Sequence, residues 1–419
     1  MEVFKFGGAS INNAERMKNT GNIIAGQTEK TLVVVSAMGK TTNALEAVAE
    51  SFYQGNTNLA LQLFEKIKDN HLQLIKFLIT KEWRQAEDRI KNFFTETEWL
   101  LHDKPVRHFD YYYDQIVCTG ELMSSSILEH YLKELGCNCT WIDVRDIIRT
   151  DNNFRDANID WSFTGAKIDQ QILPLFGNHD IVITQGYIGA TDENESTTLG
   201  REGSDYSAAV FANLLSAESV TIWKDVEAVM NADPRLYRDA VKIAELSYNE
   251  VIEMAYYGAQ VIHPKTIKPL QNKGIPLLVK SFLDPSLPGT IISKINSKNI
   301  PPVIIHKNNQ VLISFKSKDF SFVEGKPMDQ LLEIFRAAKV KSNLSQHTAI
   351  SLLCCFDEHP EKIGKIAEEA SLLFDVEVSP GLSLLTIRHY NLEEINKMTS
   401  DREIILEQRT GQTCQMVLR

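Results

Sequence analysis

Short runs of hydrophobic residues recur along the first 295 residues and are separated by segments with helical spacing. Apolar residues three or four positions apart, such as Leu59, Leu63 and Ile67, predict helices between these runs. Strands that alternate with helices predict an α/β fold in which helices cover a mostly parallel sheet. The predicted strands lie at 2–6, 31–37, 139–144, 180–189, 218–226 and 275–282, and further helices at 121–135, 205–217 and 247–259.

The pattern changes near Ser293. The stretch 293–303 is polar and contains Pro301 and Pro302, which is typical of a linker. Beyond it we predict shorter elements, with helices at 328–338 and 360–373 and strands at 311–317, 349–356, 383–389, 402–409 and 414–419. The chain is therefore expected to contain a large α/β region over 1–295 and a smaller α+β region over 303–419.

Composition narrows the possible partners. A net charge of −11 disfavours a general nucleic-acid surface or an anionic membrane surface, because both need a basic face. The start, MEVFKFGG, has neither a basic nor an apolar leader segment, and no run reaches the ~18 apolar residues of a membrane span. The six cysteines form no C-x-x-C pair, and no histidine spacing completes a zinc site. We expect a cytoplasmic protein with no protein-held metal, and with Cys354 and Cys355 in the core.

A loop with the letters GKT, at 39–41, follows the second predicted strand. A nucleotide-binding P-loop would need a glycine five residues before Gly39, and this chain has Val34 there. A buried β-branched residue cannot supply the turn that wraps a phosphate. We therefore predict that this loop is not a P-loop.

The segment KFGGAS, residues 5–10, comes directly after the first predicted strand. Gly7 and Gly8 leave the backbone free to approach an anion such as a phosphate, and Lys5 can place an ammonium group against that phosphate. Ser10 belongs to this turn, and Ser36 ends the next strand, at the edge where open α/β sheets place ligands. A plain strand-turn-helix connection and a capping serine are the alternative interpretations.

Two other segments carry charged residues near predicted strand ends. In TTLGREGSDYSAA, Arg201 lies between two glycines, where its guanidinium suits a carboxylate, and Ser204 and Asp205 start a helix. Glu121, in CTGELMSS, could bind an amino group. The alternatives are a capped helix with a surface arginine and an acid that satisfies a helix dipole.

The segment WKDVEAVMNADPR, residues 223–235, is the last candidate. Lys224 and Asp225 could contact a purine and a ribose, and Arg235 could reach a phosphate. An exposed loop with scattered charges is the alternative.

Taken together and in this order, the segments resemble the aspartokinases of the amino acid kinase superfamily. The tail resembles the paired ACT modules with which this family senses end-product amino acids. The resemblance implies an amino acid kinase fold with a substrate lobe over about 1–195, a nucleotide lobe over about 196–295, and a tandem ACT-like region over 303–419 whose second unit looks truncated. The matching pieces are KFGG-S (5–10), VVVSAM-G-TT (33–42), GE-MS (120–124), TQGYIG (184–189), TTLGR-GSDY-AA (197–209), W-DV--V--ADPR (223–235) and GA-V-HP-T (258–266).

The resemblance also implies the reaction, in which ATP and L-aspartate give 4-phospho-L-aspartate and ADP with Mg²⁺. Because the attacking carboxylate has an ordinary pKa near ~3.9, it is ionised at pH 7, and Asp205 is expected to orient groups rather than act as a base. The catalytic residues would be Lys5 and Asp205. The substrate would be bound by Thr42, Glu121, Arg201 and Ser204, and ATP by Lys5, Gly7, Gly8, Ser10, Ser36, Lys224, Asp225, Asp233 and Arg235.

Four positions depart from the family pattern. Ala9 replaces a threonine beside the phosphates, and Glu202 replaces a glycine beside Arg201. Gln260 replaces a lysine expected near the ATP phosphates, so either Lys265 or another cation compensates or ATP binds more weakly. Asn343 replaces an acid common at the family's effector sites, where lysine or threonine would act as the feedback effector.

Two rival functions stay open. Another amino acid kinase, such as a glutamate or carbamate kinase, would share the phosphate turn. A catalytically silent amino-acid sensor would use only the tail. By analogy we expect a homodimer, and a monofunctional enzyme without a homoserine dehydrogenase domain.

Overall fold

The computed structural model describes residues 1–295, 300–319, 322–323 and 325–419, so positions 296–299 of the predicted linker lie outside the described residues. The chain divides into two compact units. The first comprises Met1–Val229, Ala244–Ile252 and Val261–Ser297, and the second comprises Met230–Ile243, Glu253–Gln260 and Lys298–Arg419. Among the described residues, no helix is both long and apolar enough to cross a membrane.

An eight-stranded sheet forms the centre of the first unit, with the strand order β3-β4-β2-β1-β7-β9-β10-β8. The pairs from β3 to β9 are all parallel, and only β10 runs antiparallel to β9. The central strand β2 is buried along its whole length, as expected for a strand covered by helices. The strands are β1 (Glu2–Phe6), β2 (Thr31–Val35), β3 (Cys139–Trp141), β4 (Ile181–Gln185), β7 (Ser219–Lys224), β8 (Glu245–Ser247), β9 (Leu277–Ser281) and β10 (Thr290–Ser293).

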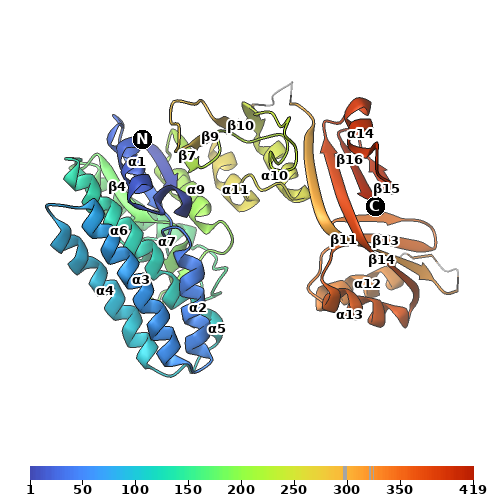
Figure 1. Ribbon diagram of the computed structural model, residues 1–419, viewed down its shortest axis with the longest axis horizontal. Helices are drawn as coiled ribbons and strands as arrows, with labels where there is room; N and C mark the ends of the chain where they lie inside the picture. Colours follow the sequence, from blue (N-terminus) through green and yellow to red (C-terminus); the bar gives the residue numbers. More distant parts are fainter. Residues whose placement is uncertain (296–299, 320–321, 324) are drawn as a thin grey trace. The chain divides into compact units, whose positions relative to one another are not determined.

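Helices α6 (Thr119–Glu134) and α9 (Gly203–Leu215) pack directly on this sheet, and both are buried along most of their length. Helices α3 and α4 lie side by side (Figure 1), and both contact α6, whereas α11 packs on α9. The remaining α-helices of this part are α1 (Ala14–Ala25), α2 (Thr41–Tyr53), α3 (Thr57–Leu78), α4 (Trp83–His102), α5 (Phe109–Val117), α7 (Trp161–Lys167), α8 (Leu173–Leu175) and α11 (Pro264–Lys273). Helix α10 (Tyr248–Tyr257) begins in the first unit and ends in the second.

The second unit contains a six-stranded antiparallel sheet with the order β12-β13-β11-β14-β16-β15. Two long strands, β11 (Val303–Ser317) and β14 (Phe374–Arg388), lie next to each other at its centre (Figure 1). The other elements are β12 (Leu344–His347), β13 (Ser351–Asp357), β15 (Ile404–Arg409), β16 (Thr413–Leu418), α12 (Lys326–Ala337), α13 (Pro360–Ser371) and α14 (Leu392–Thr399).

The long strands serve two cores. One end of β11 packs with α12 and α13, and the other end packs with α14 and β16. The second core also contains Ala232 and Tyr237, which explains why Met230–Ile243 belongs to this unit although the sequence suggested the nucleotide lobe. Cys354 and Cys355 are buried on opposite faces of β13, as predicted for core residues.

The predicted fold class, a mostly parallel α/β sheet followed by an ACT-like α+β region, is confirmed. Individual boundaries differ for physical reasons. The predicted strand 180–189 is two strands, β4 and β5 (Ile188–Ala190), because the chain turns at Gly186 and Tyr187, whose φ is +72°. Strand β5 pairs with β6 (Ser196–Thr198) in a separate two-stranded sheet.

Candidate active site

Three charged side chains meet at the carboxyl ends of the central strands of the first unit. Lys5 lies on β1, and Lys224 is the last residue of the adjacent parallel strand β7. Asp205, in the first turn of α9, places Oδ1 2.6 Å from Lys5 Nζ and Oδ2 4.0 Å from Lys224 Nζ. Lys224 also donates to the carbonyl of Val261 at 2.8 Å. Because parallel strands end at one edge of the sheet, distant residues converge there.

The acid in this cluster is held in its charged form. Asp205 is buried, and burial alone would raise its pKa, but the charges of Lys5 and Lys224 outweigh burial and lower the pKa of the carboxyl. A carboxylate with a lowered pKa is a poor proton acceptor near neutral pH. The geometry therefore favours Asp205 as a positioning group for the two ammonium groups.

The predicted phosphate turn is packed against the GKT loop, backbone to backbone. A Cβ on Gly8 would come within 2.7 Å of the Ala37 carbonyl oxygen and 2.8 Å of that of Gly39, so only glycine fits. The amide of Gly39 donates to the carbonyl of Gly8 at 3.0 Å. A Cβ on Gly7 would lie 3.3 Å from Lys5 Nζ. The two loops thus form one wall beside the Lys5 ammonium. Val34 lies inside β2, as expected if the GKT loop is not a P-loop.

The predicted serines have different surroundings. The Ser10 hydroxyl is buried and donates to the carbonyl of Gly7 at 2.6 Å, so it closes the turn from within. Ser36 follows β2, and its carbonyl accepts from the Ser124 hydroxyl at 2.7 Å, which ties this strand end to α6. A phosphate contact by either serine stays a prediction.

Glu121 is a buried carboxyl group at the start of α6. Only 2% of the residue is exposed, and its Oε2 has no hydrogen-bond partner among the residues that the structure describes. Burial raises its pKa to about 8, against the opposing effects of the Ala37 amide and the Lys5 charge. A buried acceptor without a partner carries a large energetic penalty, which a substrate ammonium group would relieve.

The substrate-side residues Thr42 and Ser204 lie at the first turns of α2 and α9. A Cβ on Gly186 would lie 2.7 Å from the Ser204 Cβ, so this glycine of TQGYIG lets the start of α9 approach β4. Arg201 is exposed on the loop before α9. Glu202 Oε2 accepts from the amide of His263 at 2.9 Å.

The remaining predicted nucleotide residues lie on several different segments of the chain. Asp225 is exposed in the turn after β7. Asp233 and Arg235 belong to the second unit, where they pair with each other at 2.7 Å. Lys265, suggested as a substitute cation for Gln260, binds Asp156 at 2.6 Å. A role of Asp225, Asp233 and Arg235 in binding ATP stays a prediction.

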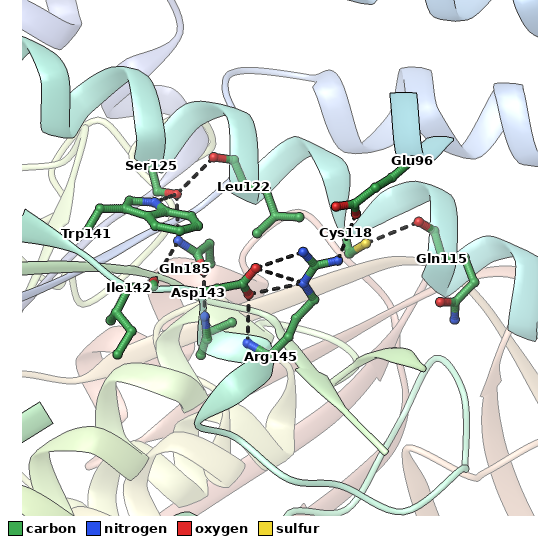
Figure 2. Close-up of polar contacts among 11 residues, drawn as sticks. Glu96, Gln115, Cys118, Leu122, Ser125, Trp141, Ile142, Asp143, Arg145 and Gln185 are labelled. Carbon is green, nitrogen blue, oxygen red and sulfur yellow. Dashed lines mark hydrogen bonds and ion pairs between the residues drawn. The ribbon is translucent and has the colours of Figure 1, made fainter. Parts of the chain in front are cut away.

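Gln185 is a site-supporting residue that the motif alone did not reveal (Figure 2). Its Oε1 accepts from the Val144 amide at 2.8 Å, and its Nε2 donates to the Ser125 hydroxyl at 2.8 Å. Trp141 Nε1 donates to the same hydroxyl at 2.9 Å. Ser125 is one helical turn after Glu121, so this network fixes the helix that carries the buried acid. A polar residue at the end of the all-buried strand β4 was the available signal.

Asp143 and Arg145 extend this support in the same view (Figure 2). Arg145 binds both carboxylate oxygens of Asp143 and also reaches Glu96 at 3.3 Å. The paired charges fix the loop after β3 that supplies the Val144 amide to Gln185.

Comparison with known proteins decides the family. Residues 1–281 match the model of the Amino acid kinase family. The chain is 31% identical over 398 residues to the lysine-sensitive aspartokinase 3 of Escherichia coli (strain K12), which is 92% of this chain and 86% of that protein. This chain belongs to the aspartokinases. Its enzyme class is accordingly aspartate kinase, a phosphotransferase with a carboxyl group as acceptor.

Solved aspartokinase structures agree with this assignment. The E. coli aspartokinase III complex with lysine and aspartate, in the T-state, superposes with a TM-score of 0.83 at 27% identity and covers 100% of this chain and 95% of that one. The complex of the same enzyme with aspartate and ADP, in the R-state, gives a TM-score of 0.79 at 28% identity and covers 100% and 96%. The bifunctional aspartokinase/homoserine dehydrogenase 2 of Arabidopsis thaliana is longer: the chain is 29% identical to it and spans 44% of its length.

Proposed function

We propose that the chain transfers the γ-phosphoryl group of ATP to the side-chain carboxylate of L-aspartate, giving 4-phospho-L-aspartate and ADP. This is the first step toward lysine, threonine and methionine. The observation that carries the proposal is the buried Glu121 carboxyl, one oxygen of which has no partner among the described residues, within the electrostatic reach of Lys5. An acceptor for an ammonium group and a cation for phosphates at one sheet edge suit a substrate that is an amino acid and is phosphorylated.

In this mechanism Glu121 binds the α-ammonium group and Arg201 the α-carboxylate of aspartate, with Thr42 and Ser204 close by. The side-chain carboxylate attacks the γ-phosphorus, a new O–P bond forms, and the bond to the bridging oxygen of ADP breaks with its electron pair on ADP. No proton has to be moved, which agrees with the low basicity of Asp205. Two anions must meet, so the ammonium groups of Lys5 and Lys224 offset their repulsion.

Mg²⁺ fits the donor set at this edge of the sheet. Proteins commonly bind Mg²⁺ through one or two carboxylates together with substrate phosphates and water, and Asp205 is a charged carboxylate in this position. When bound, the ion would neutralise phosphate charge, and Asp205 would orient its water shell. Cytoplasmic location, a homodimer and feedback by lysine or threonine through the second unit complete the proposal. The feedback is supported by the lysine sensitivity of the E. coli relative.

Hydroxylamine trapping of the acyl phosphate tests the proposal. The full chain would be incubated with ATP, Mg²⁺ and either L-aspartate or L-glutamate, with and without lysine and threonine, beside Lys5→Ala as a control for contaminating kinases. We expect a hydroxamate from aspartate only, none from the variant, and inhibition by one end product. Hydroxamate mainly from glutamate would support a glutamate kinase. No product from folded wild type would overturn catalysis and support the amino-acid sensor.

A further inference from the structure

The second unit contains a small cavity with an excess of positive charge. Its volume is about 300 Å³, and it is lined from β11, the 339–343 segment after α12, the end of β13 and the start of α13. Four lysine residues line it, three of them exposed, and Asp357 is the one carboxylate among the described lining residues. The four are Lys307, Lys339, Lys341 and Lys362.

The single acid of the cavity is already bound by neutral donors. Gln310 Nε2 and Asn343 Nδ2 each donate to Asp357 Oδ1 at 2.9 Å. Asn343 Oδ1 in turn accepts from Lys307 Nζ at 2.9 Å, so the asparagine amide is oriented on both sides. Although burial would raise the pKa of Asp357, these two amides and the Lys307 charge lower it. The carboxylate therefore stays charged but neutralises at most one of the four lysines.

Lys341 and Lys362 contact uncharged groups. Lys341 Nζ lies 4.8 Å from the centre of the Tyr256 ring, and Lys362 Nζ donates to the carbonyl of Lys339 at 3.3 Å. Within the described part of the second unit, none of the four ammonium groups forms an ion pair. Lys362 is also in the first turn of α13, where the helix end adds partial positive charge. The cavity therefore carries more positive than negative charge, which an anion would offset.

We propose that this cavity binds a small polyanion, with its negative charge on several oxygens, as in a phosphate ester or a polycarboxylate. Lysine ammonium groups recognise such oxygens as point charges, and the volume is near the lower end of ligand pockets, which suits a small molecule. A free basic amino acid is disfavoured here because it would add positive charge. The site lies within the second unit and does not depend on the proposed catalytic function.

Isothermal titration of the full chain tests the site, with pyrophosphate, citrate and L-lysine as separate probes in the absence of turnover. We expect pyrophosphate, citrate or both to bind, and this binding to weaken as salt is added. L-lysine should not compete with the bound anion. In the double variant Lys341→Gln/Lys362→Gln, the Kd should rise about tenfold or more, as expected for the loss of two charge-assisted contacts. Binding of only one probe identifies the ligand as phosphate-like or carboxylate-like.

Lys365→Gln is the matched control, since Lys365 is on the same helix but pairs with Glu369 at 3.8 Å and does not line the cavity. It should bind the anion like wild type, and Lys341→Arg/Lys362→Arg should retain binding because the charge is kept. If the double glutamine variant melts early, each single variant should still weaken binding about threefold. Absence of anion binding to wild type, or equal binding in wild type and the glutamine variants, would overturn the proposal.

Discussion

Lysines surround both candidate sites, but the two units use positive charge in opposite ways. In the first unit, Lys5 and Lys224 share the buried Asp205, so one of the two positive charges is balanced inside the protein and the groups are fixed before any substrate arrives. In the second unit, four lysines face one exposed acid that amide groups already bind. A lysine in a buried ion pair stabilises the fold as well as serving the reaction. Lysines without an ion-pair partner are stabilised only when an anionic ligand binds. The same residue type should therefore respond very differently to mutation in the two units.

The largest effect is expected for Lys5→Ala. Removal of this cation leaves Asp205 buried with only Lys224 nearby, and breaking a buried pair from one side typically costs ~3–5 kcal/mol of unfolding free energy. The loss of transition-state stabilisation should lower kcat by about 10²–10³-fold. Chemical denaturation and hydroxamate formation measure the two losses, with the exposed Lys30→Ala as control. Near-normal turnover in Lys5→Ala would contradict the assignment.

The second-largest effect is expected for Glu121→Gln, whose effect on stability should depend on pH. The pKa of Glu121 is raised from 4.5 to about 8 in the folded protein, so the folded chain retains a proton that the unfolded chain has lost. The part of the burial cost that depends on ionisation is therefore absent near pH 4, grows as pH rises from 4.5 to about 8, and stays constant above that. We expect Glu121→Gln to raise the melting temperature relative to wild type at pH 9 but not at pH 5.

The same substitution should weaken aspartate binding. The substrate ammonium group needs the ionised carboxylate, so the KM of wild type for aspartate should fall as pH rises through 8. In Glu121→Gln, the KM should be about 10–100-fold higher, as expected for the loss of a charge-assisted hydrogen bond, and nearly independent of pH in this range. The KM for ATP serves as the internal control. A parallel increase in both KM values would argue against a specific contact to aspartate.

Much of the first unit was predictable because short stretches of its sequence specify its strands. Buried runs such as TLVVV specify strands, and parallel strands bring their ends together, so Lys5 could be placed at the edge of the sheet. That Asp205 lies beside it, at 2.6 Å, was suggested only by the resemblance to aspartokinases. Gln185 could not be assigned, because its partners Val144 and Ser125 come from other elements. The long strands of the second unit were predicted only in part, since β11 contains the polar stretch KNNQ, where the pairing with β14 shifts register.

A moderate effect is expected for Gly8→Ala. The added methyl group would lie 2.7 Å from one backbone oxygen and 2.8 Å from another, so the phosphate turn and the GKT loop must separate. Such overpacking typically costs ~1–3 kcal/mol of unfolding free energy, and turnover should fall because the wall beside Lys5 moves. Gly364→Ala in α13 is the control, since its methyl group meets no atom within 4 Å and should be neutral or stabilising. Equal melting temperatures for the two variants would contradict this packing.

The smallest effect is expected for Lys341→Gln in the absence of ligand. This change removes one of four unpaired positive charges, so the melting temperature should be unchanged or slightly higher, in contrast to Lys5→Ala. Thermal melting at low and high salt measures this change, because salt should reduce any gain in melting temperature. A clear loss of stability would show that this lysine is structural and would remove the contrast between the two units.

Transfer of oxygen from substrate to phosphate tests the central claim most directly. The chain would be supplied with ATP, Mg²⁺, hydroxylamine and L-aspartate labelled with ¹⁸O in its side-chain carboxylate. If this carboxylate attacks the γ-phosphorus, hydroxylamine releases phosphate that carries one labelled oxygen, visible as an isotope-shifted phosphorus resonance. We predict such a signal, equal in amount to the hydroxamate formed. Phosphate released without label would contradict the account, because it would mean that water rather than the aspartate carboxylate attacks ATP.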